Sequence, residues 1–169
     1  YDKQKLIDDF EALSTYLTHT EYKYFMFRDF QSRNILITDS QGGRSVHFID
    51  FQGGMKGAPQ YDVASMIWQA RANLPDEWKN NLLEDYMSSF ESIIENTVDR
   101  EVFRSQFNGY VLIRLLQVLG AYGFRGLFER KAQFLTSIPT ALKNLKGFFE
   151  NQSLGIVLTE FQRVLTICT

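Results

Sequence analysis

Three oxygen-bearing side chains in the first third of the sequence have types and surroundings that suit metal and phosphate chemistry. Asp29 and Asn34 lie five residues apart in a polar stretch between two apolar runs. Asp50 ends a third apolar run, just before a glycine-bearing segment. Carboxylate and amide oxygens are ligands that a hard cation such as Mg²⁺ prefers. These three residues are therefore the first candidates for a functional site.

The spacing of Asp29 and Asn34 is by itself weak evidence for such a site. The numbers of Asp and Asn residues in the chain predict about 0.5 pairs at this spacing by chance. A second pair, Asp76 and Asn81, does have the same spacing. Asp76 follows Pro75 where a helical pattern begins, so a helix N-cap or first-turn acid explains it without any chemistry.

The segments around and after the first pair distinguish it from the second. Residues 27–34, FRDFQSRN, resemble the catalytic loop of the protein-kinase-like phosphotransferases, in which an Asp is followed five residues later by an Asn. Residues 46–51, VHFIDF, resemble the metal-binding Asp-Phe-Gly element, with Gln52 where the Gly usually stands. Residues 59–64, PQYDVA, resemble the segment that opens the helix after the metal loop. In this order, the motifs are similar to those of aminoglycoside and choline kinase-type phosphotransferases.

This resemblance implies a role for each candidate residue. Asp29 would orient and deprotonate an acceptor hydroxyl, while Asn34 and Asp50 would hold Mg²⁺ at the phosphates of ATP. Arg33 is either a cofactor-binding residue that stabilises charge near the γ-phosphate or an exposed loop arginine. Asp62 is expected to cap the helix that follows it, bracing the loop without reacting.

The residues that fill the first motif narrow the resemblance. Residues 31–33 and Gln52 resemble the residues at these positions in one group of relatives. These relatives are the bacterial cell-wall sugar kinases that phosphorylate N-acetylmuramate or N-acetylglucosamine at the anomeric hydroxyl. Phe27, however, stands where many relatives have a His that braces the loop, and we expect Arg28 to replace that brace through its rigid donor fork. Only 28 residues precede Asp29, whereas the family places a whole ATP-covering lobe upstream of this position.

Hydrophobic periodicity predicts the elements that position these residues. An amphipathic helix is predicted over residues 3–18, and the glycine-bearing segment 53–59 is predicted to be an irregular loop. Short strands are predicted over residues 22–27, 34–38 and 46–51, of which the last two form a hairpin. Separated strands and helices indicate an α+β fold, here a protein-kinase-like C-terminal lobe, mostly helical, with a small hairpin carrying the catalytic and metal loops.

The remainder of the chain is helical in pattern. Apolar residues at helical spacing mark residues 63–70, 82–94, 103–118, 142–149 and 156–165. Breakers are expected at Pro75, Pro139, Gly120, Gly123 and Gly126. Structural roles, as strand, helix-end or core residues, are assigned to His47, His19, Phe103, Phe107 and Tyr110.

Composition limits the partners and the location of the protein. A formal net charge of −2 provides no global positive field for a nucleic acid or an anionic membrane. No unbroken apolar run approaches the ~20 residues needed to cross a bilayer. The single cysteine, Cys168, excludes an internal disulfide and a cysteine-rich metal site. We therefore expect a cytoplasmic protein with neither a nucleic-acid nor a membrane partner, and the family resemblance implies a sugar-like small-molecule substrate.

The length of the chain suits one compact core. We expect residues 1–169 to form a single domain, the C-terminal catalytic lobe of a phosphotransferase whose ATP lobe is absent from this chain, which alone would be inactive. The intact protein would use ATP and Mg²⁺ to phosphorylate a hydroxyl of a small molecule, with Arg71 and Arg114 as further candidates for substrate contacts. The alternative is a catalytically inactive kinase-like binding or regulatory module.

Overall fold

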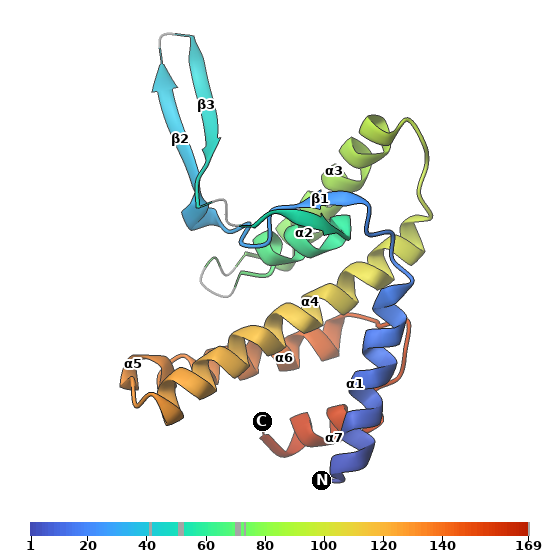
Figure 1. Cartoon of the computed structure of the whole chain (residues 1–169), viewed down its shortest axis with the longest axis vertical. Helices are drawn as coiled ribbons and strands as arrows, with labels where there is room; N and C mark the ends of the chain where they lie inside the picture. The colour runs from blue at the N-terminus through green and yellow to red at the C-terminus, as the bar shows by residue number, and fades with distance from the viewer. Residues whose placement is uncertain (41, 51–52, 70–71, 73, 169) are drawn as a thin grey trace. The chain divides into compact units, whose positions relative to one another are not determined.

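The computed structural model of the chain describes residues 1–40, 42–50, 53–69, 72 and 74–168. These residues divide into two compact units (Figure 1). We call Glu21–Val98 the strand unit, and we call Tyr1–Thr20 together with Asp99–Thr169 the helical unit. The fold is α+β and mostly helical, as the sequence predicts.

The strand unit holds the sheet segments and two helices. Its elements are β1 (Tyr24–Met26), the 3₁₀ turn η1 (Ser32–Asn34), β2 (Ile35–Ser40), β3 (Gly43–Phe48), β4 (Met55–Gly57), α2 (Pro59–Ile67) and α3 (Asp76–Ile94). The antiparallel hairpin of β2 and β3 pairs Ile35 with Phe48 at its base. Figure 1 shows this hairpin as a long ribbon that projects from the rest of the strand unit. A second antiparallel pair joins β1 to β4, with Tyr24 opposite Gly57.

The core of the strand unit lies between its helices and β1. The apolar residues buried there are Ala58, Val63, Ala64, Ile67, Leu83 and Met87. Phe90 of α3 packs edge-on against Tyr24 of β1, with ring centroids 4.9 Å apart, and stacks on Tyr86. The Tyr86 hydroxyl donates to the carbonyl of Pro59 at 3.1 Å, which ties α3 to the first residue of α2.

The helical unit contains only helices and turns among its described residues. They are α1 (Lys3–Thr18), α4 (Arg100–Gly123), the π-helical turn η2 (Phe124–Phe128), α5 (Ala132–Leu135), α6 (Ile138–Asn151) and α7 (Thr159–Cys168). Its buried apolar residues are Leu13, Phe103, Phe107, Val111, Leu112, Leu115, Ala141, Leu145, Phe148, Leu158, Phe161 and Leu165. Side-chain hydrogen bonds between Tyr16 and Ser105 and between Thr20 and Tyr110, both 2.7 Å long, fasten α1 and the turn that follows it to α4.

One helix among the described residues, Arg100–Phe128, is long and apolar enough to cross a membrane by length and composition alone. This finding qualifies the expectation that no segment suits a bilayer. The helix also supplies Phe107, Val111 and Leu112 to the buried core of the helical unit. A helix in a protein core can have the same composition, but only 22% of the apolar stretch of this helix is buried.

Most predicted elements are confirmed, and the differences have local causes. The helix over residues 3–18, the hairpin, and the helices that became α3 and α4 lie where the periodicity places them. The irregular loop predicted over 53–59 is wrong, because Met55–Gly57 forms β4 by pairing with β1. The break expected at Gly120 is also wrong, since α4 continues to Gly123 and leads into η2. A lone glycine costs a helix only about 1 kcal/mol, which neighbouring turns outweigh.

Three further differences concern the C-terminal helices. Pro139 lies in the first turn of α6 and opens this helix, a position where a missing N–H costs nothing. Residues 156 and 157, predicted as helical, precede α7, and the short helix α5 was not predicted.

Ala70, the last apolar residue of the helix predicted over 63–70, lies outside the described residues.

Candidate active site

The predicted catalytic loop connects β1 to β2 and has an unusual backbone at its start. Arg28 adopts a left-handed conformation with φ of 81°, which costs a residue with a β-carbon free energy and persists only where the surroundings enforce it. The loop then closes through η1 (Ser32–Asn34), where the Asn34 N–H donates to the carbonyl of Gln31 at 2.9 Å. The loop therefore has one defined shape, which needs an external brace at Arg28.

Asp62 supplies that brace from the first turn of α2. Its carboxylate accepts the backbone N–H of Phe27 at 2.5 Å on Oδ2 and that of Arg28 at 2.9 Å on Oδ1. The predicted N-cap role of Asp62 is wrong, because the N-cap residue of α2 is Ala58 and Asp62 lies inside the helix. The predicted bracing of the loop is confirmed.

Burial raises the pKa of Tyr86 to about 12, and the negative charge of Asp62 adds to this effect.

Phe27, where the family resemblance led us to expect a His, belongs to an aromatic cluster with Phe30 and Phe48. Its ring centroid lies 5.9 Å from that of Phe30, and Phe30 lies 5.6 Å from Phe48 of β3. We expected the Arg28 guanidinium to brace the loop. The Asp62 carboxylate braces it instead, by accepting hydrogen bonds from two backbone N–H groups of the loop. Apolar packing of Phe27 and the Asp62 carboxylate thus hold the start of the loop.

The Asp29 carboxylate is held by three side chains of its own loop. Arg33 Nη2 donates to Asp29 Oδ2 at 2.7 Å, and Asn34 Nδ2 donates to the same oxygen at 3.3 Å. Gln31 Nε2 donates to the other oxygen, Oδ1. The side chain of Asp29 remains 38% exposed, so a substrate hydroxyl can still reach it.

Asn34 is buried, and the direction of its amide is fixed. Its Nδ2 donates to the backbone carbonyl of Asp29 at 2.9 Å as well as to the carboxylate. Since the amide nitrogen faces Asp29, the amide oxygen points to the opposite side. A neutral oxygen in a fixed direction is the kind of ligand that Mg²⁺ accepts.

The hairpin brings Asp50 to the same end of the ladder as Asn34. The N–H of Ile49 donates to the carbonyl of Asn34 at 3.0 Å, which extends the β2–β3 pairing by one residue. Asp50 follows directly, is exposed, and adopts a left-handed φ of 60°. Residues 51 and 52, which complete the resemblance to the Asp-Phe-Gly element, lie outside the described residues.

The donor set of Asn34 and Asp50 fits Mg²⁺ better than a transition metal. In the described part of the chain, no group of three or more His, Cys, Asp or Glu side chains could hold a metal ion. Magnesium needs no such cage, because it usually binds one or two protein oxygens and completes its shell with water and substrate phosphates. An amide oxygen and a carboxylate at one end of a hairpin meet that requirement.

A further brace, which the sequence did not reveal, holds the middle of the loop. The Oε1 atom of Gln69, just after α2, accepts the Ser32 N–H at 3.1 Å and the Ser32 hydroxyl at 2.8 Å. Neither residue belongs to a recognisable motif, so only the fold brings them together. Gln31 was part of the narrower motif, but its contact with Asp29 was not anticipated.

The remaining candidates have structural partners or lie outside the description. His47 Nε2 forms a 3.0 Å hydrogen bond with the Thr38 hydroxyl across the hairpin, in agreement with its predicted structural role. Asp76 is a first-turn acid of α3, as predicted, and pairs with Lys79. The side chain of Arg114 donates to Gln117 on its own helix. Arg71 lies outside the described residues.

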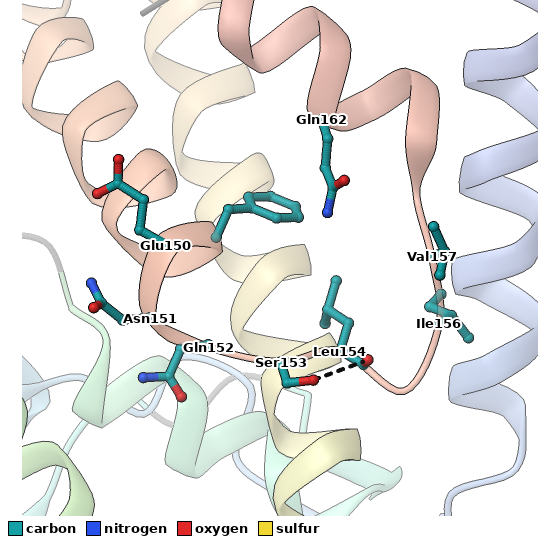
Figure 2. Close-up of a pocket in the computed structure, with 9 residues that line it drawn as sticks. Glu150, Asn151, Gln152, Ser153, Leu154, Ile156, Val157 and Gln162 are labelled. Carbon is teal, nitrogen blue, oxygen red and sulfur yellow. Dashed lines mark hydrogen bonds between the residues drawn. The ribbon is translucent and has the colours of Figure 1, made fainter.

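A cavity of about 410 Å³ lies in the helical unit, between the end of α6 and the start of α7. Figure 2 shows Gln162 on α7 and Glu150, Asn151 and Gln152 near the end of α6, with the Ser153 hydroxyl directed to the carbonyl of Leu154. None of the predicted site residues lines this cavity. We therefore keep the candidate active site in the strand unit.

Comparison with known proteins agrees with the geometry of the loop. The family model of the phosphotransferase enzyme family matches residues 2–94, more than half of the chain. The chain therefore belongs to the phosphotransferase enzyme family. It is also similar to an N-acetylmuramate/N-acetylglucosamine kinase of Caulobacter vibrioides (strain ATCC 19089 / CIP 103742 / CB 15), with 20% identity over 146 residues. That match covers 86% of the chain but only 39% of the relative.

Proposed function

We propose that the protein containing this chain transfers the γ-phosphoryl group of ATP to a hydroxyl of a small, sugar-like molecule. An amino sugar or an N-acetylated cell-wall sugar is the acceptor we favour. The observation that carries the proposal is the hydrogen-bonded loop in which Asn34 donates to both the carbonyl and the carboxylate of Asp29. The similarity to the N-acetylmuramate/N-acetylglucosamine kinase of Caulobacter vibrioides supports the choice of acceptor.

Each residue has a distinct task in this proposal. The half-exposed carboxylate of Asp29 accepts a hydrogen bond from the acceptor hydroxyl and takes its proton as the new oxygen–phosphorus bond forms. Asn34 and Asp50 hold Mg²⁺, which neutralises charge on the phosphates when it is bound. Arg33, which is 64% exposed and paired with Asp29, would contact a phosphate oxygen through its planar donor fork.

The domain organisation and location of the protein are part of the proposal. The chain spans 39% of the length of the relative that it matches, so we propose that it acts as the C-terminal lobe of a longer enzyme. An upstream lobe would supply further contacts to ATP. We propose a cytoplasmic location, where ATP is available to such an enzyme.

The decisive test uses the full-length protein and measures Mg²⁺-dependent ATP consumption with amino sugars, N-acetylated sugars, choline and aminoglycosides as acceptors. We expect turnover with at least one sugar. Asp29→Asn should lower kcat by about 10³-fold, within the range for loss of a general base, while the affinity for ATP stays within about twofold. Asp76→Asn is the matched control, since Asp76 also precedes an Asn by five residues but lies on α3.

Two results would count against this function. Near-normal turnover in the Asp29→Asn variant would remove Asp29 from the mechanism. A protein that binds Mg²⁺ and ATP but consumes no ATP with each of the tested acceptors would favour the alternative, an inactive binding or regulatory module.

A further inference from the structure

The two oxygens of the Asp29 carboxylate have different surroundings. Oδ2 accepts hydrogen bonds from Arg33 and Asn34, whereas Oδ1 accepts one from Gln31 among the described residues. A carboxylate oxygen has two lone pairs that can accept hydrogen bonds. Oδ2 is therefore saturated, and Oδ1 keeps one acceptor position for an incoming hydroxyl.

Gln31 determines how Oδ1 is presented. Its side chain is half-buried, and its backbone carbonyl is held by the N–H of Asn34 at 2.9 Å. The donors on Oδ2 already restrict rotation of the carboxylate about its Cβ–Cγ bond, because both oxygens turn together. The hydrogen bond from Gln31 to Oδ1 is a second point of attachment, so the direction of the remaining lone pair is set at both oxygens.

Gln31 also has hydrogen-bonding capacity beyond this contact. Its amide nitrogen carries two hydrogens, of which one is directed to Oδ1. The second hydrogen can donate to an atom of an acceptor molecule that binds at Oδ1. An oxygen next to the reacting hydroxyl, such as a neighbouring hydroxyl or a ring oxygen, would complete this hydrogen bond.

We propose that Gln31 is a positioning residue that directs the acceptor hydroxyl to Oδ1 of Asp29 and selects alcohols carrying a second oxygen on the adjacent carbon or on the same carbon. This inference rests on the proposed function. In the reaction, the acceptor oxygen bonds to the γ-phosphorus, and the bond from that phosphorus to the bridging oxygen breaks to release ADP. The hydroxyl proton passes to Oδ1.

The test compares Gln31→Met with the wild-type full-length protein, because methionine keeps the length of the side chain and removes its donor. We expect kcat/KM for the acceptor to fall about 10- to 100-fold, as expected for a misplaced reactant. The KM for ATP should stay within about twofold. Asp76→Asn is the control, since Asp76 lies in the first turn of α3 and its substitution leaves all donors to Asp29 in place; kcat/KM should stay unchanged.

A second arm measures the selection directly. Wild-type protein should prefer a sugar over its deoxy analogue that lacks the neighbouring oxygen, and Gln31→Met should lose that preference. Gln31→Ala repeats the comparison in case the methionine disturbs folding, and thermal unfolding checks both variants. If both Gln31 variants keep the acceptor kcat/KM and the preference of an active wild type, the inference fails and the proposed function stands. If the wild type phosphorylates no acceptor, both fail together.

Discussion

The two units of the chain are stabilised in different ways. The helical unit buries the aromatic rings of Phe103, Phe107 and Phe148 in its core. Among the described residues of the strand unit, the buried apolar side chains are aliphatic, and Phe25 and Phe48 are more than half exposed. The strand unit instead fixes its catalytic loop by hydrogen bonds from loop backbone and side chains. We infer that substitutions in the helical unit act mainly on stability, and that substitutions in the strand unit act mainly on catalysis.

Phe148→Ala should give the largest effect on stability and so provides the strongest test of this contrast. Phe148 is fully buried, and removal of such a ring costs about 3–5 kcal/mol. Phe124→Ala, at a ring that is 56% exposed in the same unit, should cost much less. Chemical unfolding followed by circular dichroism measures both.

The same experiment tests whether the units unfold separately. Both tryptophans, Trp68 and Trp78, belong to the strand unit, so their fluorescence reports on that unit alone. We expect Phe148→Ala to shift the circular dichroism transition further than the fluorescence transition. Equal shifts would show that the two units unfold as one, and the contrast between them would not hold.

Asp62→Asn should have the largest effect on catalysis among substitutions outside the reacting groups. The carboxylate accepts two backbone N–H groups, and a hydrogen bond to a charged group contributes about 1.5–3 kcal/mol. An amide has only one oxygen to accept with, so the backbone at Arg28 should relax. We expect kcat of the full-length protein to fall about 10- to 100-fold, with about 1.5–3 kcal/mol lost from the free energy of unfolding.

Steady-state kinetics and chemical unfolding of the same Asp62→Asn preparation separate the two effects. Asp85→Asn on α3, an exposed position in the same unit, serves as the control and should change neither quantity. A variant at Asp62 that loses several kcal/mol of stability but keeps its turnover would reverse our assignment of the brace.

Gly155→Ala should have a smaller effect, confined to the helical unit. A β-carbon at this position would lie 2.5 Å from the Tyr16 hydroxyl and 2.7 Å from the Ser105 hydroxyl. These two hydroxyls share a hydrogen bond, so the substitution should break it at a cost of about 1–2 kcal/mol. Gly120→Ala is the control, because nothing lies within 4 Å of its β-carbon. That change should leave stability equal or raise it, as measured by thermal unfolding.

The smallest effect is a pH dependence in the helical unit. The hydrogen bonds from the Arg163 guanidinium lower the pKa of Glu160 from 4.5 to about 2. Because the pKa of Glu160 is lower in the folded state, its charged side chain stabilises the fold fully above about pH 4.5. This contribution is lost as the pH falls toward 2. Glu160→Gln should reduce the loss of thermal stability across this window, while Glu150→Gln should not. Parallel stability profiles for wild type and Glu160→Gln would contradict this prediction.

The elements that could be predicted from sequence are those whose pattern is local. The hairpin of β2 and β3 has its partners close in the chain, and the apolar repeats of α1 and α3 are complete within each helix. The strand β4 was missed because its partner, β1, lies about 30 residues earlier. A short segment with Lys56 and Gly57 has little strand character of its own, and only this distant pairing defines it.

The same distinction applies to the candidate site. Asp29, Asn34 and Asp50 could be selected because their motifs occupy consecutive segments. The contact between Asp62 and the loop backbone spans 34 residues or more, and no periodicity encodes it. The polar contacts around Asp29 depend on rotamers within the loop, which a sequence pattern does not specify.

The hairpin has a consequence for the length of the chain between the two proposed magnesium ligands. The positions of Asn34 and Asp50 are determined at the base of the hairpin, where Ile35 pairs with Phe48. The far end of the hairpin is the pair Ser40 and Gly43. Lengthening each strand by two residues at that far end would keep every side chain on its original face. The sequence distance between the ligands is therefore independent of their separation in space, and the distal end of the ribbon is a natural position for an inserted epitope or a fluorescent label.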